Sequence, residues 1–494
     1  MAGFPQLEFL GTLSYVVSNT ILTMWPKISL MQSIFTSNFN IPVLYGMQKR
    51  DGSYVQYKPI LSLTGSKLPT VELGDHFTYL GRLFDYEGKD NVAKANLEKK
   101  LHDMLLVTDS IQTSTQNKLK ILSRYILSHI SFELKIYNFA STWIDNTLDA
   151  LCYRFIRRWM QLPISACLIE LHTLERKKGG LGLPSIKSLA GKLKITSRHT
   201  LRHSADPNIR KMWRDSSPKY VTTDETLLKN ASLSQAKNSF KNSLMAEAWS
   251  HLSALNTQGA SIKMINFVIE TKNINLWAKT IENLPELLFN FAHKALLQTL
   301  PTLANLARWK LSVDSSCKLC NHNCPQTNKH VLANCSSIIA LNRYTSRHNE
   351  ILYILYSWLR SVVNKNQHIF VDLAVENSTE SANIFQRLRP DLLVYDLNSV
   401  CAYELTICHE TNLQKSKEYK REKYRSLSED LTPAFRLKPV LYFSLEVSVL
   451  GFISSSLDFT KACNLPPMPV NVSQSIIRTV MSQSYKIYCN RNNP

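Results

Sequence analysis

The chain has 494 residues, of which 44% are hydrophobic and 19% are charged. Hydrophobic cores stop growing at about 250 to 300 residues, so this length predicts several domains, and the composition excludes a disordered or fibrous protein. The excess of 58 Lys and Arg over 38 Asp and Glu favours a polyanionic partner, nucleic acid before an anionic membrane surface. The sequence contains no run of about 18 apolar residues, so no membrane span is predicted. The N-terminus lacks the basic cluster of a signal peptide.

The first 215 residues include the most basic part of the chain. Residues 1–60 carry no pattern that assigns them a fold or a role. The run from residue 69 to residue 81 predicts a short hairpin around Gly74 and Asp75, and helical patterns begin at Asn91. Residues 91–214 contain 21 Lys and Arg but only 9 Asp and Glu. This concentration of positive charge predicts a surface that binds a phosphate backbone.

One predicted helix in this region carries three arginines. Apolar residues recur at helical spacing from Ile144 to Trp159, while Arg154, Arg157 and Arg158 fall on or beside the opposite face. That face is either an ordinary solvated surface or a nucleic-acid-binding one.

A glycine-rich loop follows this helix. Lys177 and Lys178 precede the sequence Gly-Gly-Leu-Gly at residues 179–182, in which small residues let a backbone approach a phosphate. The loop lacks the spacing of a P-loop or a dinucleotide-binding fingerprint, so it is a weak signal. Beyond it, residues 216–260 are rich in Ser, Asn and Lys, and a domain boundary is expected between Ser216 and Ser239.

Four potential metal ligands lie within nineteen residues. Cys317 and Cys320 form a Cys-x2-Cys pair, and His330 and Cys335 complete the set Cys-x2-Cys-x9-His-x4-Cys. This set suits tetrahedral zinc, because the first pair binds the ion from one turn and the second reaches it from one face of a helix. Four protein ligands leave no open position for water, which predicts structural zinc.

Alternatives to this ligand set stay open. Cys324 is a spare thiol that can replace a neighbour, and His322 is a weaker competitor. The other interpretation is a group of incidental cysteines beside a surface histidine. The clustering of Cys residues favours a metal site in a reducing compartment over a disulfide framework.

The second constellation is a pair of carboxylates. Arg389-Pro390-Asp391 introduces a predicted strand over residues 392–395, and a turn at residues 396–399 leads into a second strand over residues 400–407. If residue 395 pairs with residue 400, Asp391 lies directly opposite Glu404, with the Cβ atoms about 5 Å apart. Two carboxylates this close repel each other, so the register predicts a magnesium or manganese ion between them.

A helix predicted over residues 413–431 supplies basic residues beside this pair. Lys417, Lys420, Arg421 and Tyr424 share one face of it. A lysine from this face can activate water and stabilise charge on a phosphate, as a metal-dependent phosphodiesterase requires. The alternative is a surface hairpin with an ordinary charge pair beside a solvated helix.

With these motifs in this order, the chain resembles the C-terminal half of polyproteins from non-LTR retrotransposons that carry a restriction-like endonuclease. The family's Cys/Cys/His/Cys knuckle matches the four zinc candidates, and its Arg-His-Asn matches Arg347-His348-Asn349. Its signature of Lys/Arg-Pro-Asp followed by an acidic residue matches Arg389-Pro390-Asp391 and, after twelve residues, Glu404. Residues 77–81 and 179–182 are similar to the region after the polymerase palm, including the thumb.

The resemblance implies a multidomain α+β fold. Its expected parts are a mostly helical, thumb-like basic region over residues 61–215, a helical linker region over residues 216–310, a small zinc knuckle over residues 311–345, a restriction-like PD-(D/E)xK nuclease core over residues 346–465 and a C-terminal tail over residues 466–494.

The resemblance also implies a metal-dependent DNA endonuclease. Asp391 and Glu404 are the expected ligands of the catalytic magnesium or manganese. Thr406 occupies the position of the family's lysine, so Lys420 is the expected replacement and Lys417 the second choice. Such an enzyme nicks one DNA strand, and the freed 3′-hydroxyl primes reverse transcription of the element RNA. The nucleic-acid-binding candidates are Arg154, Arg157, Arg158, Lys177, Lys178 and Arg389.

The chain departs from the family in its polymerase part. It contains no Ala-Asp-Asp or Tyr-x-Asp-Asp carboxylate pair. Without these ligands a two-metal polymerase reaction has no centre, so no reverse transcription is expected from this chain alone. The alternatives are a nucleic-acid-binding remnant with an inactive nuclease and a relic without a selected function.

Partners and location follow from this interpretation. The expected partners are a DNA target, the element RNA and a full-length reverse transcriptase, and no membrane partner is expected. The expected cofactors are structural zinc and catalytic magnesium or manganese. A nuclear location follows from a genomic DNA substrate; otherwise the protein is expected in the cytoplasm.

Overall fold

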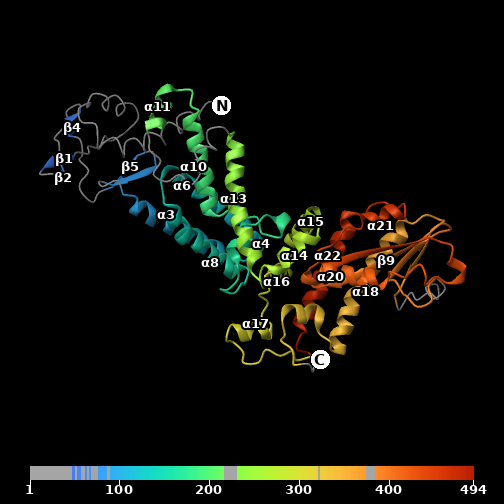
Figure 1. The fold of residues 1–494 in the computed structure, drawn as a ribbon. Coiled ribbons are helices and arrows are strands. Elements are labelled where there is room, and N and C mark those ends of the chain that lie inside the picture. The colour runs from blue at the N-terminus through green and yellow to red at the C-terminus, as the bar shows by residue number, and fades with distance from the viewer. Residues whose placement is uncertain are drawn as a thin grey trace. The chain divides into compact units, whose positions relative to one another are not determined.

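A computed structural model of the chain describes residues 47–50, 53–56, 62–63, 66–67, 76–79, 81–85, 89–215, 231–320, 323–373 and 384–493. The chain forms two compact units. Unit 1 comprises Met1–Thr113, Lys118–Ile156 and Pro184–Leu244, and unit 2 comprises Ser114–Asn117, Arg157–Leu183 and Met245–Pro494. Helices predominate and are combined with small sheets (Figure 1), so the expected α+β class is confirmed.

The strands of unit 1 form two-stranded antiparallel hairpins. They pair β1 (Met47–Arg50) with β2 (Ser53–Gln56), β3 (Ser62–Leu63) with β4 (Ser66–Lys67), and β5 (His76–Tyr79) with β6 (Arg82–Asp85). The last hairpin turns next to Gly81, whose φ of 79° favours glycine. Gly74 and Asp75, around which a hairpin is predicted, lie outside the described residues, whereas residues 76–79 pair with residues 82–85.

The helices that begin in unit 1 build most of its core. They are α3 (Asn91–Ser110), the π-helical η1 (Leu122–Ile126), α5 (Leu127–His129), α6 (Ser131–Ile136), α7 (Ser141–Trp143), the π-helical η2 (Ile144–Asp149), α8 (Ala150–Trp159), α10 (Ile186–Arg202), α11 (Pro207–Asp215) and α13 (Leu233–Ala254). Helix α4 (Thr115–Ile121) begins in unit 2 and ends in unit 1. In α3, Leu97, Leu101 and Leu105 repeat every fourth residue and are buried, as one face of a helix requires. The helix predicted from Ile144 to Trp159 is confirmed as η2 and α8.

The expected boundary between Ser216 and Ser239 falls partly outside the described residues, because residues 216–230 are not among them. The segment from residue 233 belongs to the continuous helix α13, and the two units divide within this helix, at Leu244. The predicted region 61–215 is also divided, since Arg157–Leu183 belongs to unit 2. Chain order alone therefore does not give the borders of these units.

Unit 2 contains helices before and after residues 317–335, which hold the four predicted zinc ligands and are called the zinc-ligand segment below. They are α9 (Leu168–Thr173), the 3-10 helix η3 (Arg176–Lys178), α14 (Ala260–Val268), α15 (Thr271–Glu282), α16 (Glu286–Leu296), α17 (Leu303–Arg308), the π-helical η4 (His330–Asn334), α18 (Ile338–Val362), the 3-10 helix η5 (Glu410–Asn412), α20 (Leu413–Lys423), the 3-10 helix η6 (Pro433–Phe435), α21 (Leu457–Ala462) and α22 (Val470–Cys489). Among the described helices, none is both long and apolar enough to cross a bilayer.

A four-stranded mixed sheet follows the zinc-ligand segment, in the order β10-β9-β8-β7. Its strands are β7 (His368–Val371), β8 (Leu392–Tyr395), β9 (Val400–Cys408) and β10 (Val440–Ser448); β9 runs parallel to β10 and antiparallel to β8. Tyr395 pairs with Val400 and Leu392 with Tyr403, so the predicted hairpin register is confirmed.

Helices cover this sheet, as the orange and red part of Figure 1 shows. On one face, Leu393, Val400 and Ala402 form a core with Tyr424 and Leu427, which follow α20. On the other, the ring of Phe459 in α21 stacks on Tyr403 at a centroid distance of 4.0 Å. Both faces are therefore buried, which explains the nearly continuous apolar sequence of β9.

The predicted C-terminal tail is wrong, because residues 470–489 form the helix α22, which packs on α15, α16 and α18. Ile476, Ile477, Val480 and Met481 of this helix are at most 1% exposed. Their spacing gives one apolar face, and this face completes the core of unit 2.

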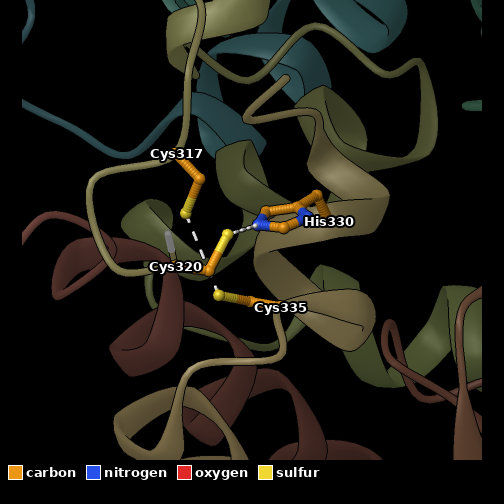
Figure 2. Close-up of side chains that lie close together, drawn as sticks. All are labelled: Cys317, Cys320, His330 and Cys335. Atoms are coloured by element: carbon orange, nitrogen blue, oxygen red, sulfur yellow. Dashed lines mark hydrogen bonds between the residues drawn. The ribbon is translucent and has the colours of Figure 1, made fainter. Parts of the chain in front are cut away.

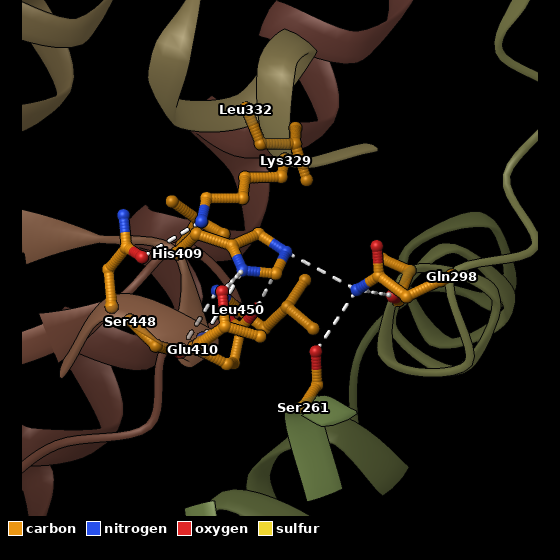
Figure 3. A network of polar contacts seen from close by, with 12 residues as sticks. Ser261, Gln298, Lys329, Leu332, His409, Glu410, Ser448 and Leu450 are labelled. Atoms are coloured by element: carbon orange, nitrogen blue, oxygen red, sulfur yellow. Dashed lines mark hydrogen bonds and ion pairs between the residues drawn. The ribbon is translucent and has the colours of Figure 1, made fainter. Parts of the chain in front are cut away.

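A polar network joins the helices before the zinc ligands to the end of the sheet (Figure 3). Gln298 Nε2 donates to Ser261 Oγ at 3.0 Å and lies 3.3 Å from Nε2 of His409, which directly follows β9. Lys329 Nζ, beside the zinc ligand His330, donates to Asn412 Oδ1 at 2.9 Å. These partly buried hydrogen bonds link the zinc-ligand segment and the helices before it to the end of the sheet within unit 2.

Candidate metal centres

The four predicted zinc ligands converge (Figure 2). Their ligand atoms all lie within 4.8 Å of one another, and Cys317, Cys320, His330 and Cys335 are all buried. Cys317 Sγ lies 3.8 Å from Cys335 Sγ, and Cys320 Sγ lies 3.6 Å from His330 Nε2. Tetrahedral zinc, with Zn–S bonds of about 2.3 Å and a Zn–N bond of about 2.0 Å, requires separations of about 3.5 to 3.8 Å. The donor set therefore fits structural zinc, and its predicted convergence is confirmed.

Local backbone structure places these ligands. Leu319 N donates to Cys317 Sγ at 3.4 Å, and Cys317 N donates to the carbonyl of Cys324 at 2.9 Å, so the first pair sits in a closed turn. The second pair comes from η4, with His330 at its first residue and Cys335 directly after its last. Burial lowers the pKa of His330, which favours the neutral imidazole that a metal ion requires.

Cys324 lies beside this set. Its Sγ is 3.5 Å from His330 Nδ1 and 3.4 Å from Cys320 Sγ. It also lies 3.8 Å from His330 Nε2. These separations suit either a hydrogen bond to the histidine ligand or a place among the ligands, so the alternative that Cys324 replaces a neighbour stays open. His322, the weaker competitor, lies outside the described residues.

The predicted carboxylate pair forms directly before β8, at Asp391, and in the middle of β9, at Glu404. Leu405 N donates to Asp391 Oδ2 at 2.8 Å, and Asp391 N donates to Glu404 Oε2 at 3.2 Å. Each carboxylate is thus held by the backbone of the other strand. The side chain of Glu404 is 2% exposed and that of Asp391 is 18% exposed, so only Asp391 reaches solvent.

The electrostatics of this pair favour a cation. Burial raises the pKa of Glu404 and the charge of Asp391 raises it further, whereas Lys420 lowers it. Oxygen ligands are those that magnesium and manganese prefer, and a divalent ion would relieve the repulsion between the two carboxylates. Asp391 and Glu404 therefore fit such an ion.

Lys420 is the lysine that the fold brings to this pair. Its ammonium group, on α20, forms an ion pair with Glu404 Oε1. Lys417, the second choice, is exposed one turn earlier in the same helix. Thr406, at the position of the family's lysine, is buried in β9, so the positive charge comes from the neighbouring helix instead.

His348 is a residue of this site to which the sequence interpretation gave no role. It lies on α18, and its Nε2 is 3.4 Å from Asp391 Oδ2 and 3.3 Å from the carbonyl of Leu405. Burial lowers its pKa, but the hydrogen bond to Asp391 and the charge of Asp391 outweigh this, and the net pKa is raised. Its place in the motif Arg347-His348-Asn349 was the only signal in the sequence.

Glu446 is a buried carboxylate on the same sheet to which sequence reasoning gave no role. It lies on β10, where Ser444 is the register partner of Glu404, so Glu446 is two residues farther along the same face of the sheet. Its side chain is fully buried, and Ser444 Oγ donates to Oε1 at 2.5 Å. The alternation of β10 was the available signal, because it places residues 444 and 446 on one face.

The predicted nucleic-acid-binding residues are divided between the two units, with Arg154 in unit 1 and the others in unit 2. Those with exposed side chains are Arg154, Arg158, Lys177 and Arg389. Arg157 and Lys178 are partly buried: Arg157 Nη2 donates to the carbonyl of Ala166 at 3.4 Å, and Lys178 Nζ lies 5.3 Å from the ring centre of Trp249. These two cations therefore have partners within the chain, and exposed Lys177 also has one, since its Nζ lies 2.8 Å from Glu175 Oε2.

The glycine loop at residues 179–182 does not offer its backbone to a phosphate. Gly180 N donates to the carbonyl of Glu175 at 3.1 Å, and Gly182 N donates to that of Leu174 at 2.8 Å. A Cβ atom on Gly180 would lie 2.1 Å from the carbonyl oxygen of Leu174. The prediction for this loop is therefore wrong, because its glycines let it pack against its own chain.

Comparison with known proteins bears on the first metal centre. Residues 260–341 match a family model described as zinc-binding in reverse transcriptase, and this range includes all four zinc ligands. Residues 260–341 are thus similar to the zinc-binding region of reverse transcriptases. The match supports a relationship to retrotransposon reverse transcriptases, and it also includes α14 to α17 of the predicted linker region. No curated protein matches the chain.

Proposed function

We propose that this chain is a fragment of a retrotransposon reverse transcriptase polyprotein that nicks DNA with a divalent metal ion. The convergence of Asp391, Glu404 and Lys420 carries the proposal, because two carboxylates and a lysine are the groups that a metal-dependent phosphodiesterase requires. Under this proposal the chain binds DNA and the element RNA and acts in the nucleus. The zinc-binding region supplies the link to reverse transcriptases.

The order of elements around the pair supports a restriction-like fold. Helix α18 precedes three antiparallel strands, and α20 connects them to β10, which runs parallel to β9. This helix, three-strand, helix, strand order agrees with the PD-(D/E)xK core that the family resemblance implies. The two carboxylates lie where β8 begins beside β9, and Lys420 reaches them from the covering helix.

Each side chain has a distinct role in the proposed hydrolysis. Asp391 and Glu404 would hold the divalent ion, which supplies Lewis-acid stabilisation of a phosphate when it is bound. Lys420 orients the attacking water and neutralises charge that develops on the phosphate oxygens. The water oxygen loses a proton to solvent and forms a new bond to phosphorus, the bond to the 3′-oxygen breaks, and that oxygen takes up a proton. The products are a 5′-phosphate and a 3′-hydroxyl. That hydroxyl is the primer that the family's reaction needs.

Nicking of supercoiled plasmid by the purified chain, with magnesium or manganese, tests this proposal. We expect nicking by the wild-type chain and only background nicking by Asp391→Asn and Glu404→Gln. Nicking that survives both substitutions would contradict the proposed site. Plasmid binding without nicking, under either metal, would instead favour a nucleic-acid-binding remnant with an inactive nuclease.

A lysine pair on α20 gives a matched comparison. We expect Lys420→Ala to lower the nicking rate about 100-fold or more, because proton transfer and charge stabilisation by a positioned side chain contribute about that much. Lys417→Ala removes the same charge one turn away and should stay within about threefold of wild type, since salt screens the interactions of an exposed charge. Equal losses in both variants would show that α20 contributes general charge rather than a site residue.

A further inference from the structure

Helix α18 contacts both candidate metal centres through residues that follow one another closely. It begins at Ile338, three residues after the zinc ligand Cys335, and Ser337 Oγ caps it by accepting from Ala340 N at 3.1 Å. Farther along the helix, the side chains of Tyr344 and Arg347 contact the zinc-ligand segment. The next residue, His348, contacts the carboxylate pair. This arrangement makes α18 a physical connection between the two centres.

Two side chains of α18 hold the zinc-ligand segment. The Tyr344 hydroxyl accepts from Cys335 N at 3.2 Å and donates to the carbonyl of Val331 at 2.8 Å. Arg347 Nη2 donates to the carbonyl of Leu332 at 2.9 Å. These partners all belong to the short segment from His330 to Cys335, so the second pair of zinc ligands is fastened to α18.

Arg347 is itself fixed from a second direction. It is 2% exposed, and its Nη1 donates to Ser484 Oγ of α22 at 3.0 Å. A guanidinium group buried in this way cannot move without leaving further hydrogen-bond donors unpaired in the protein interior, which is costly. The position of α18 at this residue is therefore set by the zinc-ligand segment and by α22 together.

The neighbouring residue faces the carboxylate pair. His348 Nε2 lies 3.3 Å from the carbonyl of Leu405 and 3.4 Å from Asp391 Oδ2. Leu405 N donates to this same Asp391 oxygen. The imidazole of His348 thus contacts both Leu405 and the Asp391 oxygen that Leu405 N binds. These contacts together fix the orientation of the Asp391 carboxylate.

We propose that Arg347 and His348 are positioning residues, which fix Asp391 relative to the zinc-ligand segment. Loss of either residue should weaken divalent-cation binding, although only His348 touches Asp391, a proposed ligand of that cation. This inference rests on the proposed function of the carboxylate pair. Groups that orient a metal ligand typically change metal affinity about 10- to 100-fold when they are removed. Zinc binding would then support the cation site through α18.

Binding of manganese alone to the full chain with its zinc bound tests this inference. Free manganese is followed by electron paramagnetic resonance, and zinc content and thermal unfolding are measured on every variant. Manganese should leave the zinc in place, because soft thiolate ligands retain zinc over a hard ion. We expect His348→Ala to raise the Kd for manganese about 10-fold and His348→Gln, which keeps a donor, to restore part of that affinity.

Variants of the residues that contact the zinc-ligand segment test whether α18 connects this segment to the cation site. Arg347→Met keeps the length of the side chain and should raise the Kd for manganese several-fold, with one zinc per chain retained. If that variant does not fold, Tyr344→Phe, which removes a single hydroxyl, should raise the Kd about twofold to threefold. Ser346→Ala, an exposed position on the same helix, is the control and should match wild type.

The outcomes separate this inference from the proposed function. Wild-type affinity in Arg347→Met, or in Tyr344→Phe if the former is unfolded, overturns the connection. Wild-type affinity in His348→Ala overturns the positioning role, while nicking that still depends on Asp391 leaves the proposed function standing. A wild-type chain that neither binds manganese nor nicks DNA overturns both.

Discussion

His293 is a buried histidine in the helical part of unit 2, on α16. Its ring contacts the rings of Phe289 and Trp277, at centroid distances of 4.6 Å and 6.1 Å. Burial lowers its pKa to about 4 from the usual 6.5. The folded state therefore favours the neutral ring, and the stability that depends on it is present above pH 6.5 and is lost as the pH falls toward 4.

We expect a substitution at His293 to flatten this pH dependence. Between pH 7 and pH 4.5 the wild-type chain should lose about 2 to 3 kcal/mol more unfolding free energy than His293→Gln, because the glutamine does not titrate. Urea unfolding at both pH values, followed by circular dichroism, measures the difference. His172, also buried with a pKa lowered to about 4, should behave in the same way when it is replaced by Gln. Parallel losses in wild type and both variants would contradict this account.

Gly180 shows how tightly the loop after η3 packs. Because a Cβ atom there would meet the carbonyl oxygen of Leu174 at 2.1 Å, we expect Gly180→Ala to destabilise unit 2 by about 2 kcal/mol or more. The adjacent Gly179→Asn is the control: its Cβ would meet only Leu296 Cδ2 at 4.0 Å, and asparagine tolerates the φ of 85° at this position. It should cost less than about 1 kcal/mol in the same thermal-unfolding measurement, and equal costs would argue against close packing as the cause.

At the scale of elements, α22 closes the core of unit 2. Ile476 is fully buried on its inner face, whereas Val470, at its first residue, is 60% exposed. We expect Ile476→Ala to lower the unfolding free energy by about 2 to 5 kcal/mol and Val470→Ala to change it by less than about 0.5 kcal/mol. Denaturant unfolding of the two variants checks this, and a small effect at Ile476 would show that the helix is dispensable.

Strands and helices contribute different residues to the site around the carboxylate pair. Strands β8 and β9 set the distance between Asp391 and Glu404 through their register, while α20 and α18 bring Lys420 and His348. Because strand neighbours are close in sequence, their pairing is a local property. The helical residues reach the site only when the helices pack on the sheet.

At the scale of the whole molecule, the zinc ligands and the mixed sheet belong to unit 2, and unit 1 contains neither. Structural zinc contributes its binding free energy to the folding of the unit that holds it. We expect two unfolding transitions in differential scanning calorimetry. Zinc chelation should lower the midpoint temperature of only one of them, the unfolding of unit 2. Cys320→Ser should have the same effect as chelation, because it removes a ligand.

Cys489→Ser is the matched control for this prediction. Cys489 is exposed at the end of α22 and lies outside the four-ligand set, so its replacement should leave zinc content and both transitions unchanged. A shift of both transitions on chelation would contradict the assignment of zinc stability to one unit.

Local patterns in the sequence were enough to predict the convergence of the zinc ligands and the register of the carboxylate pair. The spacing from Cys317 to Cys335 predicts the zinc ligands because each pair is close along the chain and is held by a turn or a helix end. The turn at residues 396–399 predicts the register of Asp391 and Glu404 because a short hairpin leaves little choice of pairing. These interactions depend on neighbours a few residues away, which a sequence displays directly.

Tertiary structure decided what depends on residues far apart. The motif Arg347-His348-Asn349 acquires a physical role only when α18 packs between η4 and the sheet, and α22 is a core helix rather than a tail because its apolar face finds α15, α16 and α18. The glycines at residues 179–182 pack on their own chain for the same reason. The sequence by itself determined the ligand types and their local spacing, whereas long-range packing determined which other side chains reach them, because burial is a property of the whole folded unit.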